Sequence, residues 1–111
     1  MANILGHNLP PEYGWDGQMS STTVSGALTA YHSKTVAALR SMDFVINEET
    51  SRFGKNSATV QGAKIDHTTV SVRLDETEPG KTTIRVKVGS LGDRTGGERI
   101  LDEIQKQPKN M

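Results

Sequence analysis

The sequence feature that most restricts the fold of this chain is a repeated two-residue pattern over residues 68–88. Apolar residues alternate with polar ones on both sides of a Pro-Gly pair, at Val70, Val72 and Leu74 and then at Ile84, Val86 and Val88. Successive side chains of a β-strand point to opposite faces of its sheet, so each strand should have one buried and one solvated face. The segment therefore predicts a β-hairpin.

Burial of one face also predicts how the two strands pair. A two-residue loop at Pro79-Gly80 would place each apolar residue of one strand opposite a polar residue of the other, so neither face could be cleanly buried. A loop with an odd number of residues instead places Val72 opposite Val86, in the middle of three apolar cross-strand pairs. We therefore predict this register and an odd-length loop.

The solvated face of the hairpin carries three basic residues, Arg73, Arg85 and Lys87. The predicted register opposes Arg73 to Arg85, and Asp75 lies on the diagonal, where it can relieve the repulsion. These basic residues are candidates for binding an anionic partner, and surface solubility is the alternative explanation. No aromatic residue accompanies them on the strands, so the stacking platform of an RNA-binding sheet is absent.

Periodicity elsewhere predicts the remaining elements. A segment rich in Ser, Thr and Val predicts a strand over residues 18–25, and apolar steps of three or four predict a helix over residues 28–42. Shorter patterns predict strands over residues 44–46 and 57–63, separated by a polar run. The predicted fold class is α+β: a two-layer sandwich with one antiparallel sheet and two helices on one face, in the order β-α-β-β-β-α.

A final helix follows the hairpin, with an apolar stripe at Ile100, Leu101 and Ile104. Asp93 is one candidate for its N-terminal cap, and Thr95 with Glu98 three residues later is the other. In the third strand, Gly62 predicts a close approach of another backbone or of a helix.

The predicted core is mostly aliphatic, because only 5% of the residues are aromatic. Its predicted members are Val24, Leu28, Tyr31, Val36, Leu39, Met42, Phe44, Ile46, Val60, Val70, Val72, Leu74, Ile84, Val86, Val88, Leu91, Ile100, Leu101 and Ile104.

A chain of 111 residues predicts one domain. Residues 1–16 show no periodicity and should form an irregular leader, residues 17–107 a single α+β domain, and residues 108–111 a tail. The leader contains Tyr13 and Trp15, which are candidate binding residues because large aromatics carry much of the affinity at interfaces. The alternative is that Trp15 folds back onto the edge of the domain.

Composition narrows the classes of function. Thirteen basic residues balance thirteen acidic ones, so we expect no nucleic-acid partner. The chain has no cysteine, which excludes disulfides and thiol nucleophiles. No apolar run approaches the ~18–20 residues of a membrane-spanning helix, and the first residues lack the features of a secretion signal. As written, the chain would be cytoplasmic.

Candidate chemistry is sparse. The three histidines, His7, His32 and His67, lack partners at the spacing of a zinc site, and no serine lies in a nucleophile-elbow motif. Residues 89–97 contain four glycines and could bind an anion through backbone amides, although a tight strand-to-helix turn explains the same glycines. We expect no enzyme activity, no catalytic residue, no metal site and no cofactor.

Three segments resemble a known family. They read VAALRSMDFVINEE, TTVSVRLDETEPGKTTIRVKVGSLGD and ERILDEIQ, and their shared motifs are Ala38-Leu39, Val88-Gly89, Leu91-Gly92-Asp93 and Ile100-Leu101. Together they resemble a family of small bacterial domains of unknown function that are commonly lipoproteins. The resemblance covers about residues 18–107. It implies a periplasmic or cell-envelope setting and supplies no catalytic residues.

The chain departs from this family at two points. Asp43 stands where the family has a glycine after the first helix, and we expect it to take the left-handed conformation there. The lipid-bearing cysteine of a lipoprotein is missing, so membrane attachment would require a lipid anchor that this chain lacks.

Two functions follow as hypotheses. The first is a non-enzymatic accessory domain that acts through a protein partner or self-association, by its solvated sheet face or its leader. The second is a module that binds a small ligand or a polyanion at the basic hairpin face or at residues 89–97. Binding driven by charge should weaken steeply with salt, whereas a contact anchored by aromatic residues should not.

Overall fold

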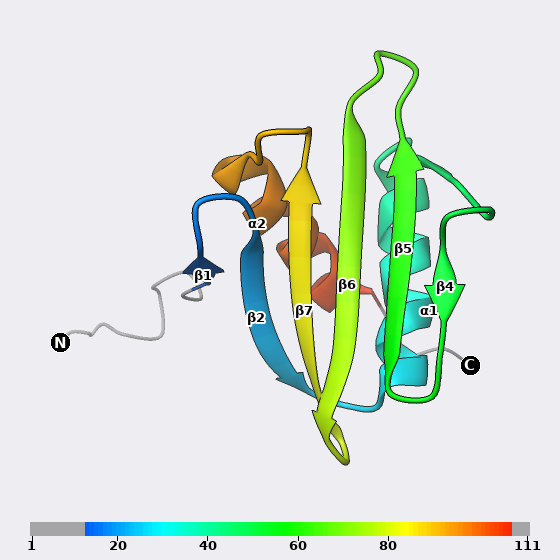
Figure 1. Cartoon of the computed structure of the whole chain (residues 1–111), viewed down its shortest axis with the longest axis vertical. Helices are drawn as coiled ribbons and strands as arrows, with labels where there is room; N and C mark the ends of the chain where they lie inside the picture. Colours follow the sequence, from blue (N-terminus) through cyan, green and yellow to red (C-terminus); the bar gives the residue numbers. More distant parts are fainter. Residues whose placement is uncertain (1–12, 108–111) are drawn as a thin grey trace, which may run out of the picture.

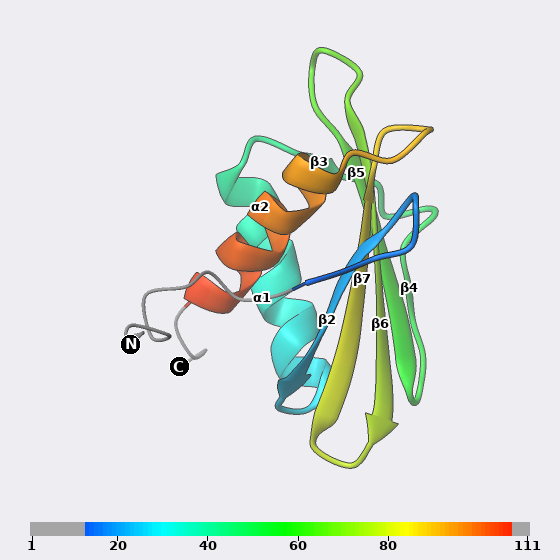
Figure 2. The ribbon, with the colours of Figure 1, turned by 90° about the vertical axis from the view of Figure 1, so that its left-hand side faces the viewer.

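The computed structural model describes residues 13–107. They form a seven-stranded antiparallel sheet with two helices on one face, which confirms the predicted α+β sandwich (Figures 1 and 2). The elements are β1 Gly14–Trp15, β2 Ser20–Ser25, α1 Leu28–Ser41, β3 Val45–Ile46, β4 Arg52–Phe53, β5 Ser57–Ala63, β6 Thr69–Glu78, β7 Lys81–Val88 and α2 Arg94–Lys106. The strand order is β1-β2-β7-β6-β5-β3, and β4 also pairs with β5.

The described residues have seven strands, whereas the predicted order β-α-β-β-β-α has four. The predicted segments account for five of the seven, and two short strands, β1 and β4, were not predicted. β1 lies within the segment expected to be an irregular leader, so the leader prediction is wrong for Gly14 and Trp15. β4 lies within the polar run after β3. A two-residue strand shows no period of its own, and each of these forms because a longer neighbour, β2 or β5, offers an open edge. Residues 1–12 and 108–111 lie outside the described part of the chain.

The hairpin of β6 and β7 has the predicted register but not the predicted loop. Val72 pairs with Val86, and the apolar pairs on either side of it are also as predicted. The turn is nevertheless the two-residue Pro79-Gly80 turn, and Gly80 has a φ of 80° as a type II turn requires. A β-bulge at Thr77 adds one residue to β6, so the two-residue turn and the apolar register occur together. A bulge also adds local twist.

The helices cover the sheet from one side and complete its core. α1 packs against β5 and β6, and α2 packs against β2 and β7 (Figure 2). Thirteen of the predicted core residues are buried, and Val24, Tyr31, Val36, Met42 and Ile46 are partly buried against them. Leu91 is the one wrong prediction, with 84% of its surface exposed.

Leu91 is exposed because its loop turns away from the core. Gly89 and Gly92 both have positive φ values, of 74° and 87°, which glycine adopts at no steric cost. The connection between β7 and α2 then projects away from the helix layer (Figure 2). The apolar character of Leu91 therefore gives no information about burial here.

Two glycines are required by close packing rather than by backbone conformation. A Cβ at Gly62 would lie 2.7 Å from the carbonyl oxygen of Val45, so the predicted close approach at Gly62 is confirmed. A Cβ at Gly97 would lie 2.6 Å from Oγ of Ser20, so this glycine allows α2 to approach β2. The first glycine thus lets β3 lie close along β5, and the second lets α2 lie close on β2.

The ends of the helices are capped by different means. α1 is followed by Asp43 at a φ of 72°, as predicted for the left-handed position. α2 begins at an Asp93 cap, whose side chain accepts from the backbone N–H of Gly96, so Asp93 and not Thr95 is the cap. No side chain from the preceding residue caps α1.

The N-terminus of α1 is capped instead by Glu76 of β6. One carboxylate oxygen of Glu76 accepts from the backbone N–H of Leu28 at 3.0 Å, and the other accepts from Gly80 at 3.1 Å. These hydrogen bonds, first the one from Leu28, hold the pKa of Glu76 below its ordinary value of 4.5. The same carboxylate therefore joins the helix start to the hairpin turn.

Candidate functional site

The candidate site is the face of the sheet that the helices leave uncovered, which we call the open face. The strand registers place Ser21, Arg85, Arg73 and Thr59 in one row across β2, β7, β6 and β5. Every second residue along each strand, counted from these four, lies on the same face, because successive side chains point to opposite faces of the sheet. Its surface consists mainly of hydroxyl, amide and guanidinium groups.

Arg73 and Arg85 lie on the open face but do not carry a free double positive charge. They are directly opposite each other, as predicted, and both contact Asp75. Nε of Arg73 lies 2.9 Å from one carboxylate oxygen of Asp75, and Nη1 of Arg85 lies 3.3 Å from the same oxygen. Asp75 therefore neutralises about half of the charge of the pair.

A second carboxylate, that of Asp16, lies close enough to Arg85 for the two charges to interact. The pKa of Asp16 lies below its ordinary value, first because its carboxylate accepts from the backbone N–H groups of Met19 and Gln18. Attraction to Arg85 contributes a smaller part in the same direction. The predicted basic face is therefore closer to neutral than the three cationic residues alone suggest.

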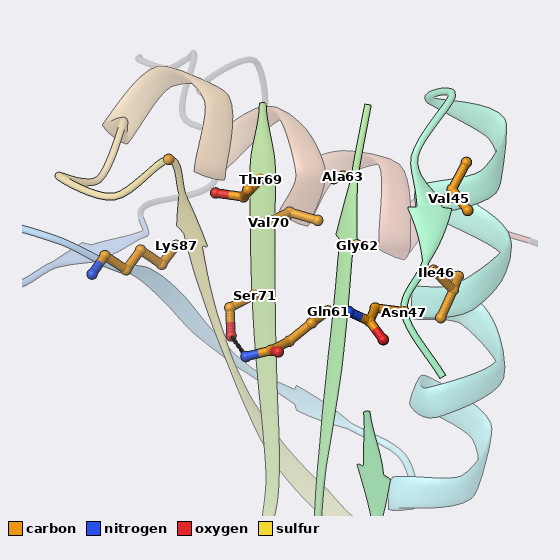
Figure 3. A pocket seen from close by; sticks show the side chains of 11 residues that line it. Val45, Ile46, Asn47, Gln61, Gly62, Ala63, Thr69, Val70, Ser71 and Lys87 are labelled. Atoms are coloured by element: carbon orange, nitrogen blue, oxygen red, sulfur yellow. Dashed lines mark hydrogen bonds between the residues drawn. The ribbon is translucent and has the colours of Figure 1, made fainter. Parts of the chain in front are cut away.

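Lys87 differs from the other two basic residues of the hairpin, Arg73 and Arg85. It forms no ion pair with any residue in the range 13–107. Beside it the open face is hollowed into a groove of about 590 Å³ (Figure 3). The polar residues that line this groove are Asn47, Gln61, Thr69, Ser71 and Lys87.

The groove is held in shape by hydrogen bonds within it. Nε2 of Gln61 donates to Oγ of Ser71 across β5 and β6 at 3.4 Å (Figure 3). Oδ1 of Asn47 accepts from the backbone N–H groups of Glu49 and Thr50, so this oxygen is already engaged. Val45, which is 72% exposed, provides an apolar wall. The groove thus combines polar groups, one ammonium and one aliphatic side.

Apart from Lys87, the groove residues were missed by sequence reasoning. The alternation in β6 does place Thr69 and Ser71 on the same face as Arg73, so that part could have been found. The contribution of Val45 and Asn47 could not, because it depends on β3 pairing with the edge of β5.

The two aromatic candidates lie apart from the groove. Trp15 is half-buried and pairs with Ser20, so its strand forms the outer edge of the sheet beside β2. Tyr13 packs against the core, and its hydroxyl donates to the carboxylate of Asp102 and accepts from Nε2 of Gln105 at 2.9 Å. Burial, and then the hydrogen bond to Asp102, raise the pKa of Tyr13 to about 12.

Tyr13 therefore ties the start of the described chain to α2, which is a structural contact. The predicted site residues consequently divide into two groups. Arg73, Arg85 and Lys87 share the open face, whereas Tyr13 and Trp15 lie at the β1 edge and against the second helix.

The glycine-rich connection between β7 and α2 is shaped as a turn. The N–H of Gly96 is used by the Asp93 carboxylate, at 3.2 Å. A negative side chain therefore already occupies the position that a bound anion would take at this helix start.

The histidines within the described residues are in structural positions. His32 of α1 packs edge-on against Phe53 of β4, with ring centroids 4.7 Å apart, and burial holds its pKa below the ordinary value of 6.5. His67 lies in the turn before β6 at a φ of 72°. Within residues 13–107, no group of three or more His, Asp or Glu residues gathers as a metal site. His7 lies outside that range.

No helix within the described range is long and apolar enough to cross a membrane. A family described as "Protein of unknown function (DUF3568)" matches residues 15–107, which extend from β1 to the end of α2. No curated protein matches the chain.

Proposed function

Because the chain belongs to the DUF3568 family of proteins of unknown function, we propose its function from its surface: a non-enzymatic interaction domain that binds a protein through its open sheet face. The observation that carries this proposal is the Arg73–Asp75–Arg85 cluster at the centre of that face. It fixes two guanidinium groups in place without making the face strongly cationic.

Such a face suits a protein contact for physical reasons. Arginine is enriched at protein interfaces because its planar group combines hydrogen bonding with apolar contact. Arg73 and Arg85 already share an acceptor, so less side-chain freedom is lost when a partner covers them. The surrounding Ser and Thr side chains are short, and they lose little rotamer entropy on burial.

The proposed setting is the bacterial cell envelope or periplasm. Its support is the resemblance of residues 18–107 to small lipoprotein domains. Fractionation of cells that carry the gene would test the setting directly, and recovery in the cytoplasmic fraction alone would contradict it.

A second candidate function is the binding of a small anionic ligand in the groove. The observation in its favour is Lys87, whose ammonium has no carboxylate partner within the described residues. Hydroxyl groups of Thr69 and Ser71 lie on the same face and can donate to such a ligand. Since the attraction would be chiefly to one partly exposed charge, binding should weaken as salt is raised.

Site-specific photocrosslinking tests the interaction proposal. A photoreactive side chain at Thr69, which is exposed within the open face, should give a discrete protein adduct in cells that carry the gene. The matched control places the same group at Arg99, which is exposed on α2. An adduct at Thr69 alone, which also forms when a lysate is irradiated in about 0.5 M salt, supports a protein contact. Absence of any adduct beyond that at Arg99 would overturn the proposal.

A further inference from the structure

The two edges of the sheet are protected to different extents. On one side, β3 and β4 together pair with four residues of β5, namely Ala58, Thr59, Gly62 and Ala63. On the other side, β1 pairs only with Ser20 and Ser21 of β2. The C-terminal half of β2 is therefore an edge with no neighbouring strand among residues 13–107 (Figure 1).

The hydrogen-bond pattern identifies the backbone groups that this edge exposes. The backbone N–H of Gly26 donates to the carbonyl oxygen of Gly80 at 2.7 Å, so even-numbered residues of β2 direct their backbone groups towards β7. Odd-numbered residues direct theirs outward, because the direction alternates in an antiparallel ladder. Ser21 is covered by Gly14. Thr23 and Ser25 each present an outward N–H and C=O without a backbone partner in the described chain.

The chemistry of this edge is unusual for an exposed strand. Natural sheets protect such edges with charged residues, proline or a bulge. β2 has the sequence Ser-Ser-Thr-Thr-Val-Ser and contains none of these, and no Asp, Glu, Lys or Arg occurs between Asp16 and Lys34. By contrast, the segment around β4 at the other edge carries Glu48, Glu49 and Arg52.

We infer that a second copy of this chain pairs with the β2 edge, antiparallel, to join the two sheets into one. A two-fold arrangement places each group of the edge close to its own counterpart, so a charged edge would repel itself. The uncharged β2 edge avoids that repulsion, and the net charge of zero adds none between whole molecules. The β2 edge borders the open face, and Thr23 belongs to both surfaces. Thr69 lies on the same open face but away from this edge, which makes it the matched control below.

The parity of β2 also specifies the register. If Thr23 lies opposite Ser25 of the second copy, the outward N–H and C=O groups of these residues face each other across the two strands. The two Thr23–Ser25 pairs then form four hydrogen bonds, and the two-fold axis passes beside Val24. Val24 then faces its own counterpart in a non-hydrogen-bonded pair, with Cα atoms about 4.5 Å apart. Because the pairing segment is short, we expect a weak dimer whose population depends on concentration.

Disulfide trapping tests this register, since the chain has no cysteine of its own. A Cα separation of about 4.5 Å lies within the range that disulfides require, so the Val24→Cys variant should form a covalent dimer under mild oxidation. The control is Thr23→Cys, whose two copies would be offset by two residues, roughly 7 Å along the strands, and should not crosslink. Equal crosslinking of the two variants, or none with Val24→Cys, would overturn the inference.

Sedimentation of the full chain provides a second test that needs no new bond. Thr23→Lys places a charge on an exposed edge position, and we expect it to weaken dimerisation at least about tenfold. Thr69→Lys, on the open face, should leave the dissociation constant unchanged. A wild-type chain that stays monomeric at every concentration, or equal weakening by the two variants, would contradict edge pairing. So would dimerisation seen only after residues 1–12 are deleted, because these residues would then cover the edge themselves.

Discussion

Deletion of Thr77 should leave the fold intact, although it removes a residue from the longest strand. The bulge at Thr77 is the extra residue that reconciles the two-residue turn with the register of the buried pairs. Without it, Glu76 and Glu78 become neighbours and continue one regular ladder opposite Thr82 and Lys81. Thr77 is exposed, so we expect a cost of about 1 kcal/mol.

Deletion of Arg73, four residues earlier, should be far more damaging. The residues before the gap must then turn over, which exposes Val70 and Val72, or those after it must shift, which exposes Leu74 and buries Asp75. Burial of one valine contributes about 1.5–3 kcal/mol, so the first outcome costs about 3–6 kcal/mol. The second also buries a carboxylate and costs more. The whole domain has only about 5–15 kcal/mol of stability.

Urea unfolding followed by circular dichroism measures both effects. Deletion of Arg73 should lower the midpoint by about 2 M or abolish folding, whereas deletion of Thr77 should lower it by a fraction of that. The matched control is Arg73→Ala, which removes an exposed side chain and a surface ion pair worth about 0–1 kcal/mol. Equal destabilisation by the two deletions would refute the proposed role of the bulge.

Three further predictions concern the core and two titrating groups. Leu39→Ala should lower the free energy of unfolding, measured in urea, by about 2–5 kcal/mol because Leu39 is fully buried. The control is Ser33→Ala, on the exposed face of the same helix, and an equal effect of the two variants would contradict this packing. The depressed pKa of Glu76 means that its stabilising effect is present above pH 4.5 and is lost as pH falls through the depressed value, so Glu76→Gln should remove part of the acid sensitivity of the melting temperature. The pKa of His32 is also depressed, so the contribution of neutral His32 to stability is present above pH 6.5 and is lost as pH falls through the depressed value. Phe53→Ala should raise that pKa in an NMR titration. An unchanged value would show that Phe53 does not shield the His32 ring from water.

Part of the candidate site follows from local pattern alone. A period of two leaves only one face for Val70, Val72 and Leu74, and their burial places Arg73 on the opposite face. The same reasoning opposes Arg73 to Arg85. These relations are predictable because the chain has few ways to bury an alternating strand, and a shift of one residue would expose every apolar side chain.

The predicted odd-length loop is wrong because β6 is not a regular strand. A two-residue turn and the apolar register appear incompatible only if both strands are regular. The bulge at Thr77 removes the conflict, and the sequence around it carries no feature that distinguishes a bulge from a longer loop. The exposed position of Leu91 follows similarly from the conformations of Gly89 and Gly92.

The sequence by itself determined the layers of this protein, the register of its central strands and the side of the sheet on which its basic residues lie. Tertiary structure decided the cap of α1 by Glu76, 48 residues away from Leu28, the groove completed by β3, and the edge that β1 leaves open on β2. The physical reason is range. Alternation is a property of neighbouring residues, whereas a cap, a groove or an uncovered edge depends on which distant segments meet.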